Sequence, residues 1–471
     1  MEIDFLEMLC YNRPNDTQAR SIPVNKRTVD MTVGNPTKHI LTFALPLILT
    51  NMGQQLYMIA DGAIVGRGVG VKALAAVGAT DWICWLILWT MAGVAQSFSS
   101  FVARSFGEGN HKQLNKTIVT ASVLSAVIGA ILTVGGLWAG KPLLLLLNTP
   151  EDILPDATTY LVTMLSGTLI VAAYNMAGSI LRAFGDGRSP LVAMIVAASL
   201  NIGLDCLFVF VFKWGIFGAA LASVMAQTVS FLYCLSCLRK VEYIKLDKDA
   251  WTLDWALVKQ MIVFAVPVSL RFIIICLGGI ILQSSINDQG SMFLAGYTAT
   301  NKVYGLLECS ATSLGLAGCT FLAQNYGAGR HDRVKIGVRS AVKVVCVMAV
   351  AVASVSILGR TPLLQLFLDT NEAGGPEALE IAGRYLVIIA SCLIILYLLH
   401  IFSNALQALG IAVWSMYSGL GEFVGRVFMA KVAIQWIGHN ALFLSEPIAW
   451  LLGLLLLMLP YFYYQKKLLK T

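Results

Sequence analysis

Long apolar runs dominate the chain, and each is long enough to cross a lipid bilayer. A transmembrane helix needs about 20 consecutive apolar residues, and polar residues divide this chain into twelve such runs. The runs lie near residues 40–64, 73–102, 117–140, 156–180, 190–212, 215–238, 258–286, 290–322, 336–359, 380–406, 411–437 and 440–464. Short polar loops join them and leave no room for a soluble catalytic domain. The pattern predicts an all-α integral membrane protein with twelve transmembrane helices.

The sequence also contains an internal repeat. SSFVARSFGEGNHKQ at 99–113 returns as CTFLAQNYGAGRHDR at 319–333, and LAAVGAT at 74–80 returns as LAGYTAT at 294–300. FALP at 43–46 matches FAVP at 264–267, and ILRAFG at 180–185 matches ALQALG at 405–410. A register kept over this length indicates two copies of one unit. Each copy holds six helices and returns to its starting side. We therefore expect two six-helix bundles, related by a pseudo-twofold axis along the membrane normal, with a cleft between them.

The repeat divides the chain into five segments. They are a polar N-terminal tail (1–38), the first bundle (39–238), a linker loop (239–257), the second bundle (258–464) and a C-terminal tail (465–471). Glu2, Asp4 and Glu7 occupy the start of the chain, where a cleaved signal peptide has a basic region. The sequence therefore predicts no such signal.

Composition and charge agree with a membrane protein. Of 471 residues, 57% are hydrophobic and 13% are charged, and the mean hydropathy is +0.75. A soluble domain carries about twice that share of charge. The net charge of +7 is not spread evenly, because most Lys and Arg residues fall in the two tails and in the loops on their side. By the positive-inside rule both termini are cytoplasmic, so the charge orients the protein in its cell membrane and implies no nucleic-acid partner.

The usual signatures of catalysis and metal binding are missing from the sequence. Cys234 and Cys237 form one CxxC pair inside an apolar run, without the second pair that a zinc site needs, and the five histidines lack metal-ligand neighbours. The sequence has no P-loop, GxSxG or HExxH motif. It therefore predicts a protein that is not an enzyme, without a cofactor, and with no metal beyond a possible sodium ion. An ion gradient rather than ATP is the expected energy source.

The first apolar run carries one acid, Asp61. A carboxylate at this depth is costly in lipid, so it is expected to face the bundle interior or a wet cavity. Pro46 near the start of the same run, and its repeat counterpart Pro267, each lack an amide hydrogen and predict a helix bend. The alternative is that Asp61 simply ends its helix at the outer surface.

The fifth run carries Asn201 and Asp205, which are four residues apart and so share a helix face. The predicted topology puts them at the depth of Asp61, together with Tyr160 and Ser223 on neighbouring runs. If these five groups meet, two carboxylates removed from water would share a proton or hold a hard cation such as sodium. The alternative is a hydrogen-bonded network that only locks the bundle.

Further polar residues are candidates for lining the cleft. They are Gln54, Arg271, Lys302 and Glu308. Glu422 and Arg426, four residues apart on one helix, are expected to pair with each other for structural reasons.

Several of these segments together resemble the multidrug and toxic compound extrusion (MATE) family. They are DGAIVGRGVGVKALAAVG at 61–78, the paired SFGEG and NYGAG loops, RAFGDGRSP at 182–190 and NIGLDCLFVF at 201–210. The resemblance covers nearly all of the chain after residue 34. It implies that Asp61 is the helix 1 acid, that Asn201 and Asp205 are the helix 5 pair, and that Tyr160 and Ser223 complete a cation site, with serine where threonine is familiar.

The resemblance also has a gap. Some members carry a glutamate in helix 7 and an acid in helix 10. Here helix 7 carries Arg271 and has no acid before Asp288, and helix 10 has no acid after Glu380. Cation coupling is therefore expected in the first bundle.

The resemblance implies a secondary antiporter that exports cationic or amphipathic organic compounds in exchange for protons or sodium, and the chain is expected to be monomeric. The alternative is a flippase for a lipid-linked precursor, which would need a cationic cleft for a pyrophosphate. Arg271, Lys302 and Arg426 are the candidates for such a cleft. A membrane enzyme or a receptor is a further class, disfavoured by the missing catalytic motifs and by the repeat.

Overall fold

Helices account for the regular structure of the described residues, which in this computed structural model are 28–146, 149–245, 247–368 and 374–468. The predicted tails reach beyond them, at 1–27 and 469–471. The first lobe consists of α2 (Pro36–Gly68), α3 (Val71–Gly107), α4 (His111–Leu146), α5 (Leu154–Ser166), α6 (Thr168–Ala183), α7 (Arg188–Asp205), the π-helical η1 (Cys206–Val211) and α8 (Gly215–Leu238). A short 3₁₀ helix, η2 (Lys248–Trp251), follows in the linker.

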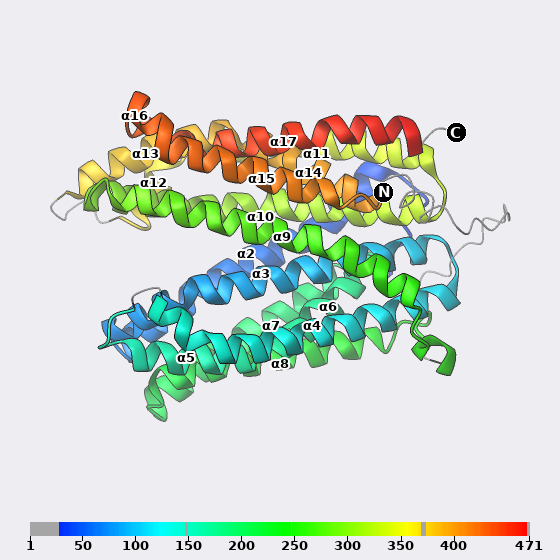
Figure 1. Ribbon diagram of the computed structural model, residues 1–471, viewed down its shortest axis with the longest axis horizontal. Coiled ribbons are helices and arrows are strands. Elements are labelled where there is room, and N and C mark those ends of the chain that lie inside the picture. Colours follow the sequence, from blue (N-terminus) through cyan, green and yellow to red (C-terminus); the bar gives the residue numbers. More distant parts are fainter. Residues whose placement is uncertain (1–27, 147–148, 246, 369–373, 469–471) are drawn as a thin grey trace.

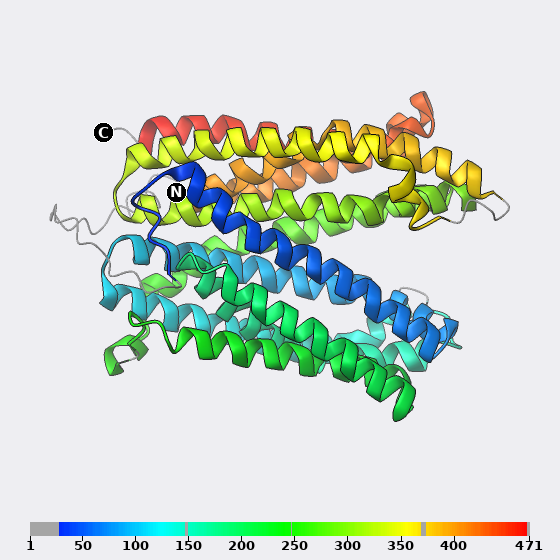
Figure 2. The same ribbon diagram turned by 180° about the vertical axis from the view of Figure 1, so that it is seen from behind.

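The second lobe repeats this order. It consists of α9 (Trp255–Asn287), α10 (Ser291–Gly327), α11 (His331–Leu358), α12 (Arg360–Gln365), α13 (Gly375–Ser391), α14 (Leu393–Ala408), α15 (Val413–Phe428), the π-helical η3 (Met429–Ala433), α16 (Ile434–Ile437) and α17 (Asn440–Leu468). Figures 1 and 2 show the two lobes one above the other, with α2 beginning and α17 ending at the same end of the molecule.

The helices form twelve long rods, one for each predicted run. Among the described residues, eight helices are by themselves long and apolar enough to cross a membrane. Two bent pairs, α5 with α6 and α13 with α14, add one span each, with bends of 44° and 45°. The remaining rods are α2 and α15 with its π-helical extension. The all-α fold with twelve transmembrane helices is therefore confirmed.

The two prolines at which the sequence predicts bends, Pro46 and Pro267, lie inside continuous helices. α2 passes through Pro46 and α9 passes through Pro267 without interruption, and the Thr50 hydroxyl donates to the Pro46 carbonyl at 2.8 Å. The sharp breaks lie instead at Gly167 and Cys392, between the paired helices. The bends expected at the two prolines stay a prediction.

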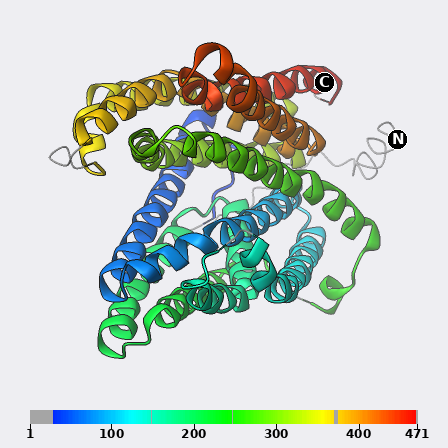
Figure 3. The same ribbon diagram turned by 60° about the vertical axis from the view of Figure 1, so that its left-hand side comes forward.

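α2 connects the lobes. It packs against α7 in its own lobe and against α10 and α11 in the second, and Figure 3 shows it running obliquely between them. α3 packs against both α9 and α10. Within this interface the Asn51 amide donates to Ser313 at 2.9 Å, and the Gln96 amide donates to Asn404 at 2.9 Å.

The end of the molecule where α2 begins is closed by crossed contacts between the lobes. The Arg104 guanidinium of α3 donates to the carbonyls of Gln407 and Ala408, at 2.7 and 3.0 Å. The Gln324 amide of α10 donates to the Ala183 carbonyl at 2.8 Å. A short segment before α2, residues 28–35, lies over the same junction and bonds to both lobes through its backbone.

Candidate functional site

Four of the five predicted cation-site residues lie where three helices of the first lobe meet. α2 carries Asp61, α7 carries Asn201 and Asp205, and α8 carries Ser223, and α7 packs against both of the others. The start of α7 is fixed by Asp186, whose carboxylate accepts the amides of residues 188 and 189 at 3.0 and 2.9 Å. This cap holds the helix that presents two of the four groups.

Asn201 is the centre of the hydrogen bonding. Its amide lies 3.2 Å from the Ser223 hydroxyl. In the orientation that satisfies both neighbours, its nitrogen donates to Asp205 Oδ2 at 2.8 Å and its oxygen accepts from the Ser223 amide and hydroxyl, at 3.3 and 3.2 Å. Asn201 and Asp205 are fully buried, and Ser223 is nearly so. The Asn201 amide therefore holds the Asp205 carboxylate in place through Oδ2.

The carboxyl groups of Asp61 and Asp205 lie within hydrogen-bonding reach of each other. Oδ1 of each is buried and has no hydrogen-bond partner among the described residues. Two neighbouring carboxylates away from water repel each other when both are charged, so the pair favours a bound cation or a shared proton. The two unpaired Oδ1 atoms can bind either a cation or a proton.

Tyr160, the fifth predicted residue, stands beside this group. It is buried on α5 in an apolar cluster with Val65 and Ala219, close enough to Asp61 for the charge of the carboxylate to act on its hydroxyl. Tyr57, which the sequence analysis missed, also contacts this group. The Tyr57 hydroxyl is 3.4 Å from Ser223 Oγ. Its spacing of four from Asp61 on α2 was the available signal.

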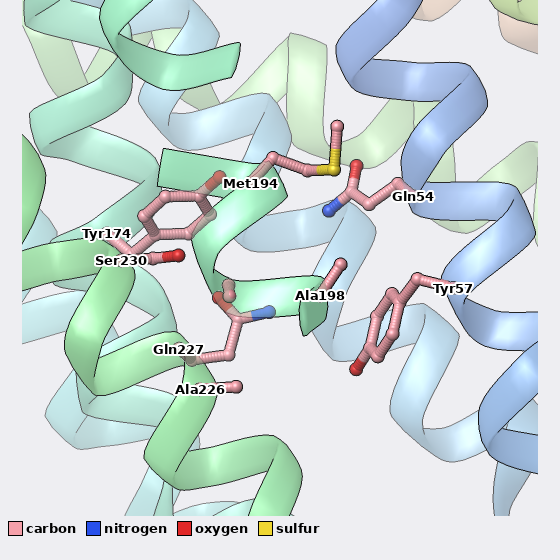
Figure 4. A pocket seen from close by; sticks show the side chains of 9 residues that line it. Gln54, Tyr57, Tyr174, Met194, Ala198, Ala226, Gln227 and Ser230 are labelled. Carbon is pink, nitrogen blue, oxygen red and sulfur yellow. The ribbon is translucent and has the colours of Figure 1, made fainter. Parts of the chain in front are cut away.

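Gln54 lines a narrow cavity inside the first lobe. The cavity measures about 20 Å³, room for about one water molecule. Figure 4 shows its walls, which come from α2, α6, α7 and α8; the lining residues are Gln54, Tyr57, Tyr174, Met194, Ala197, Ala198, Ala226, Gln227 and Ser230. Gln227 Oε1 is buried without a partner among the described residues. Since Tyr57 reaches both this cavity and Ser223, the cavity adjoins the acidic group.

Arg271 belongs to a buried ion-pair network inside the second lobe. Its guanidinium lies 3.1 Å from Glu422, and Arg426 lies 3.7 Å from Glu422. The predicted pairing of Glu422 with Arg426 is therefore present, but each has a closer partner. Arg426 binds both oxygens of Glu446, at 2.9 and 2.8 Å. Sequence spacing gave no signal for Glu446, because it lies on a different helix, α17.

The other two cleft candidates lie on α10. The Lys302 side chain is exposed and lies close enough to Asp81 of the first lobe for their charges to interact. Glu308 is partly exposed and accepts a hydrogen bond from Tyr304. The structure thus brings Arg271 and Arg426 together but leaves Lys302 apart from them.

The sequence profile of the MatE family matches residues 46–207 and 267–430, one segment in each lobe. The probable multidrug resistance protein YoeA of Bacillus subtilis (strain 168) is 28% identical over 441 residues, covering 90% of this chain and 92% of that protein. The FAD transporter of Shewanella oneidensis (strain MR-1) is 25% identical over 422 residues, covering 88% of this chain and 91% of its own length.

A solved structure shares the fold. The crystal structure of MATE in complex with MaL6 has a TM-score of 0.88 and 22% sequence identity to this chain, covering 95% of this chain and 100% of the other. Members of the family are transporters and not enzymes. With the profile matched in both lobes and the fold shared over nearly the whole length, this multi-pass membrane protein belongs to the MatE family, the multidrug and toxic compound extrusion transporters.

Proposed function

We propose that this protein is a secondary antiporter that exports cationic or amphipathic organic compounds in exchange for protons or sodium. The observation that carries the proposal is the pairing of Asp61 with Asp205, each with one buried oxygen free to bind. A cation that enters this pair removes the repulsion between the carboxylates and allows α2 and α7 to approach. Because α2 also packs against α10 and α11, such a movement would reach the second lobe.

The organic nature of the substrate is supported by the relatives. One is named a probable multidrug resistance protein and another an FAD transporter. The lipid-linked alternative needs free positive charge for a pyrophosphate. Arg271 and Arg426 instead form ion pairs with Glu422 and Glu446, and Lys302 lies close to Asp81. The buried charges therefore favour an organic cation over a pyrophosphate.

Alternating access is supported by where the lobes touch. The hydrogen bonds between lobes that involve Gln96, Arg104 and Gln324 all lie toward the end where α2 begins. If that end is cytoplasmic, as the distribution of Lys and Arg predicts, the conformation described here is closed to the cytoplasm. The cation site would then be loaded from outside, down the inward gradient of a proton or sodium ion, and the chain would work as a monomer in the cell membrane.

Proteoliposomes test the proposal with imposed proton and sodium gradients applied separately. Efflux of the fluorescent organic cation ethidium is compared for the wild type, Asp61→Asn and Asp152→Asn. Asp152 is the matched control, because it forms an exposed pair with Lys72 at 3.1 Å that contributes little. We expect one gradient to drive efflux in the wild type and the control, while Asp61→Asn binds ethidium but does not move it.

Full efflux by Asp61→Asn would show that Asp61 has no part in coupling. If neither gradient moves ethidium in the wild type, the organic-cation proposal fails. Assays with a fluorescent lipid-linked precursor would then test the alternative.

A further inference from the structure

Arg426 is the second lobe's counterpart of Asn201. α7 begins at residue 188 and α15 at residue 413, while α8 begins at 215 and α17 at 440, so both pairs keep a spacing of 225 residues. The same spacing relates Asn201 to Arg426. Both α7 and α15 continue into a π-helical segment, η1 or η3. Asn201 bonds across to Ser223 on α8, and Arg426 bonds across to Glu446 on α17, through equivalent helix pairs.

The guanidinium of Arg426 is held firmly in this place. It makes a bidentate contact with Glu446, at 2.9 and 2.8 Å, and lies 3.7 Å from Glu422. Glu422 in turn accepts from Arg271, so two cations and two carboxylates alternate through the lobe. The side chains of Arg271, Glu422 and Arg426 are at most 9% exposed. Planar bidentate pairs of this kind combine strength with fixed geometry.

Glycines make room for this network. A Cβ on Gly453 would lie 2.9 Å from Glu422, one on Gly419 would lie 2.9 Å from Arg271, and one on Gly278 would lie 3.4 Å from Arg426. All three positions lie inside helices, where glycine is less favourable than alanine. The missing side chains leave space for the charged groups of the network.

Asp61 of the first lobe has no acidic counterpart in the second lobe. The spacing that aligns FALP with FAVP carries Asp61 to Leu282, which is buried in the apolar core. Carboxylates reach this region from Glu422 and Glu446 instead, and an arginine neutralises each of them. Glu308 lies near the network, is partly exposed, and forms no ion pair with the described residues.

We infer that Arg426 is a tethered cation that permanently fills, in the second lobe, the place where the first lobe takes an exchangeable cation. The inference rests on the proposed function of Asp61 and Asp205. Since a covalently attached guanidinium cannot leave, the second lobe needs no cation from solution to neutralise its carboxylates. The transporter would then exchange cations at one lobe only.

Counting bound cations on the purified chain in lipid nanodiscs tests this inference. Sodium is counted by equilibrium dialysis with ²²Na⁺, and protons by uptake between pH 8 and pH 5.5, each measured as the difference between variants. We expect Asp61→Asn to lose the wild type's exchangeable cation completely. Arg426→Gln in the Asp61→Asn background should regain one, at the freed Glu446. Arg426→Lys in the same background should not, because it keeps the charge.

If the Asp61→Asn variant still binds a cation, the inference is overturned. If that cation is then lost when Glu308→Gln is added, its site is Glu308. A folded Arg426→Gln, Asp61→Asn variant that gains nothing would also overturn it. If the Arg426→Gln variants do not fold, Asn201→Arg gives the converse test. It brings a guanidinium to Asp205, and cation binding that survives this change contradicts the inference. A wild type that binds no cation would instead overturn the proposed function of Asp61, with the gain on Arg426→Gln still deciding the role of Arg426.

Discussion

Arg104 and Gln324 occupy the same position in the two repeats, and each bonds to the equivalent helix end in the opposite lobe. Arg104 donates to the carbonyl of Ala408 at the end of α14, and Gln324 donates to the carbonyl of Ala183 at the end of α6. Ala183 and Ala408 are themselves equivalent in the aligned ILRAFG and ALQALG segments. The two contacts form one reciprocal lock between the lobes.

Breaking this lock should open the end of the molecule that it closes. Arg104 is buried, and a hydrogen bond from a charged group contributes about 1.5–3 kcal/mol. Arg104→Ala should therefore shift the lobes toward the opened state by about tenfold or more, and Gln324→Ala by less, since its amide is neutral. Spin labels on Glu108→Cys and Asp332→Cys, in a background without other reactive cysteines, report the separation by electron–electron double resonance. An unchanged distance distribution in both variants would show that packing alone keeps this end closed.

Gly107 and Gly327 let the backbones of α3 and α10 meet beside that lock. A Cβ on Gly107 would overlap the Gln324 carbonyl oxygen, and one on Gly327 would overlap the Arg104 carbonyl oxygen. Gly107→Ala should destabilise the closed junction by about 1–3 kcal/mol, the usual cost of overpacking. The control is Gly78→Ala in the same helix, where a Cβ meets nothing within 4 Å. It should stabilise by about 0.5–1 kcal/mol. Thermal unfolding in nanodiscs compares the two, and equal midpoints would contradict the close crossing.

The fold was readable from the sequence because lipid imposes a simple rule. Backbone groups in a bilayer must bond within their own helix, so apolar length alone marks each span. The grouping of Asp61, Asn201, Asp205 and Ser223 followed from their common depth in that topology. Their roles in coupling stay a prediction.

No comparable sequence rule predicts which side chains meet between distant helices. Glu446 lies on α17, twenty residues after Arg426, at a spacing that no helical period relates. The acceptors of Arg104 are backbone carbonyls, which every residue has, so nothing in the sequence marks residues 407 and 408 as its partners. Tyr57 was the avoidable omission, since it lies one turn from Asp61.

Ser223 offers a test of the hydrogen bonds that hold the cation site. Its hydroxyl bonds to Asn201 at 3.2 Å, and losing one such bond costs about 1 kcal/mol. Ser223→Ala should therefore raise the cation concentration that gives half-maximal ethidium efflux by about fivefold, and Ser223→Thr should restore it because threonine keeps the hydroxyl. Ser236→Ala, at an exposed position of the same helix, is the control. If Ser223→Ala and Ser223→Thr need the same cation concentration for half-maximal efflux, Ser223 does not contribute to the cation site.

The segment before α2 bonds to both lobes and should depend on Arg333. The Val29 amide donates to the Phe184 carbonyl of the first lobe at 3.0 Å. The buried Met31 contacts the second lobe, where its amide donates to Gln324 and its carbonyl accepts from Arg333, both at 3.0 Å.

Arg333→Ala should free this segment while leaving the helices intact. The variant loses the bonds to the Met31 and Gly34 carbonyls, so amide exchange across residues 28–35 should speed up by about tenfold or more. Lys335→Ala, two residues further along α11, is the control and should leave exchange unchanged. Hydrogen–deuterium exchange with mass spectrometry measures both. If Arg333→Ala exchanges like the wild type, burial of Met31 holds the segment, and Met31→Ala should then release it.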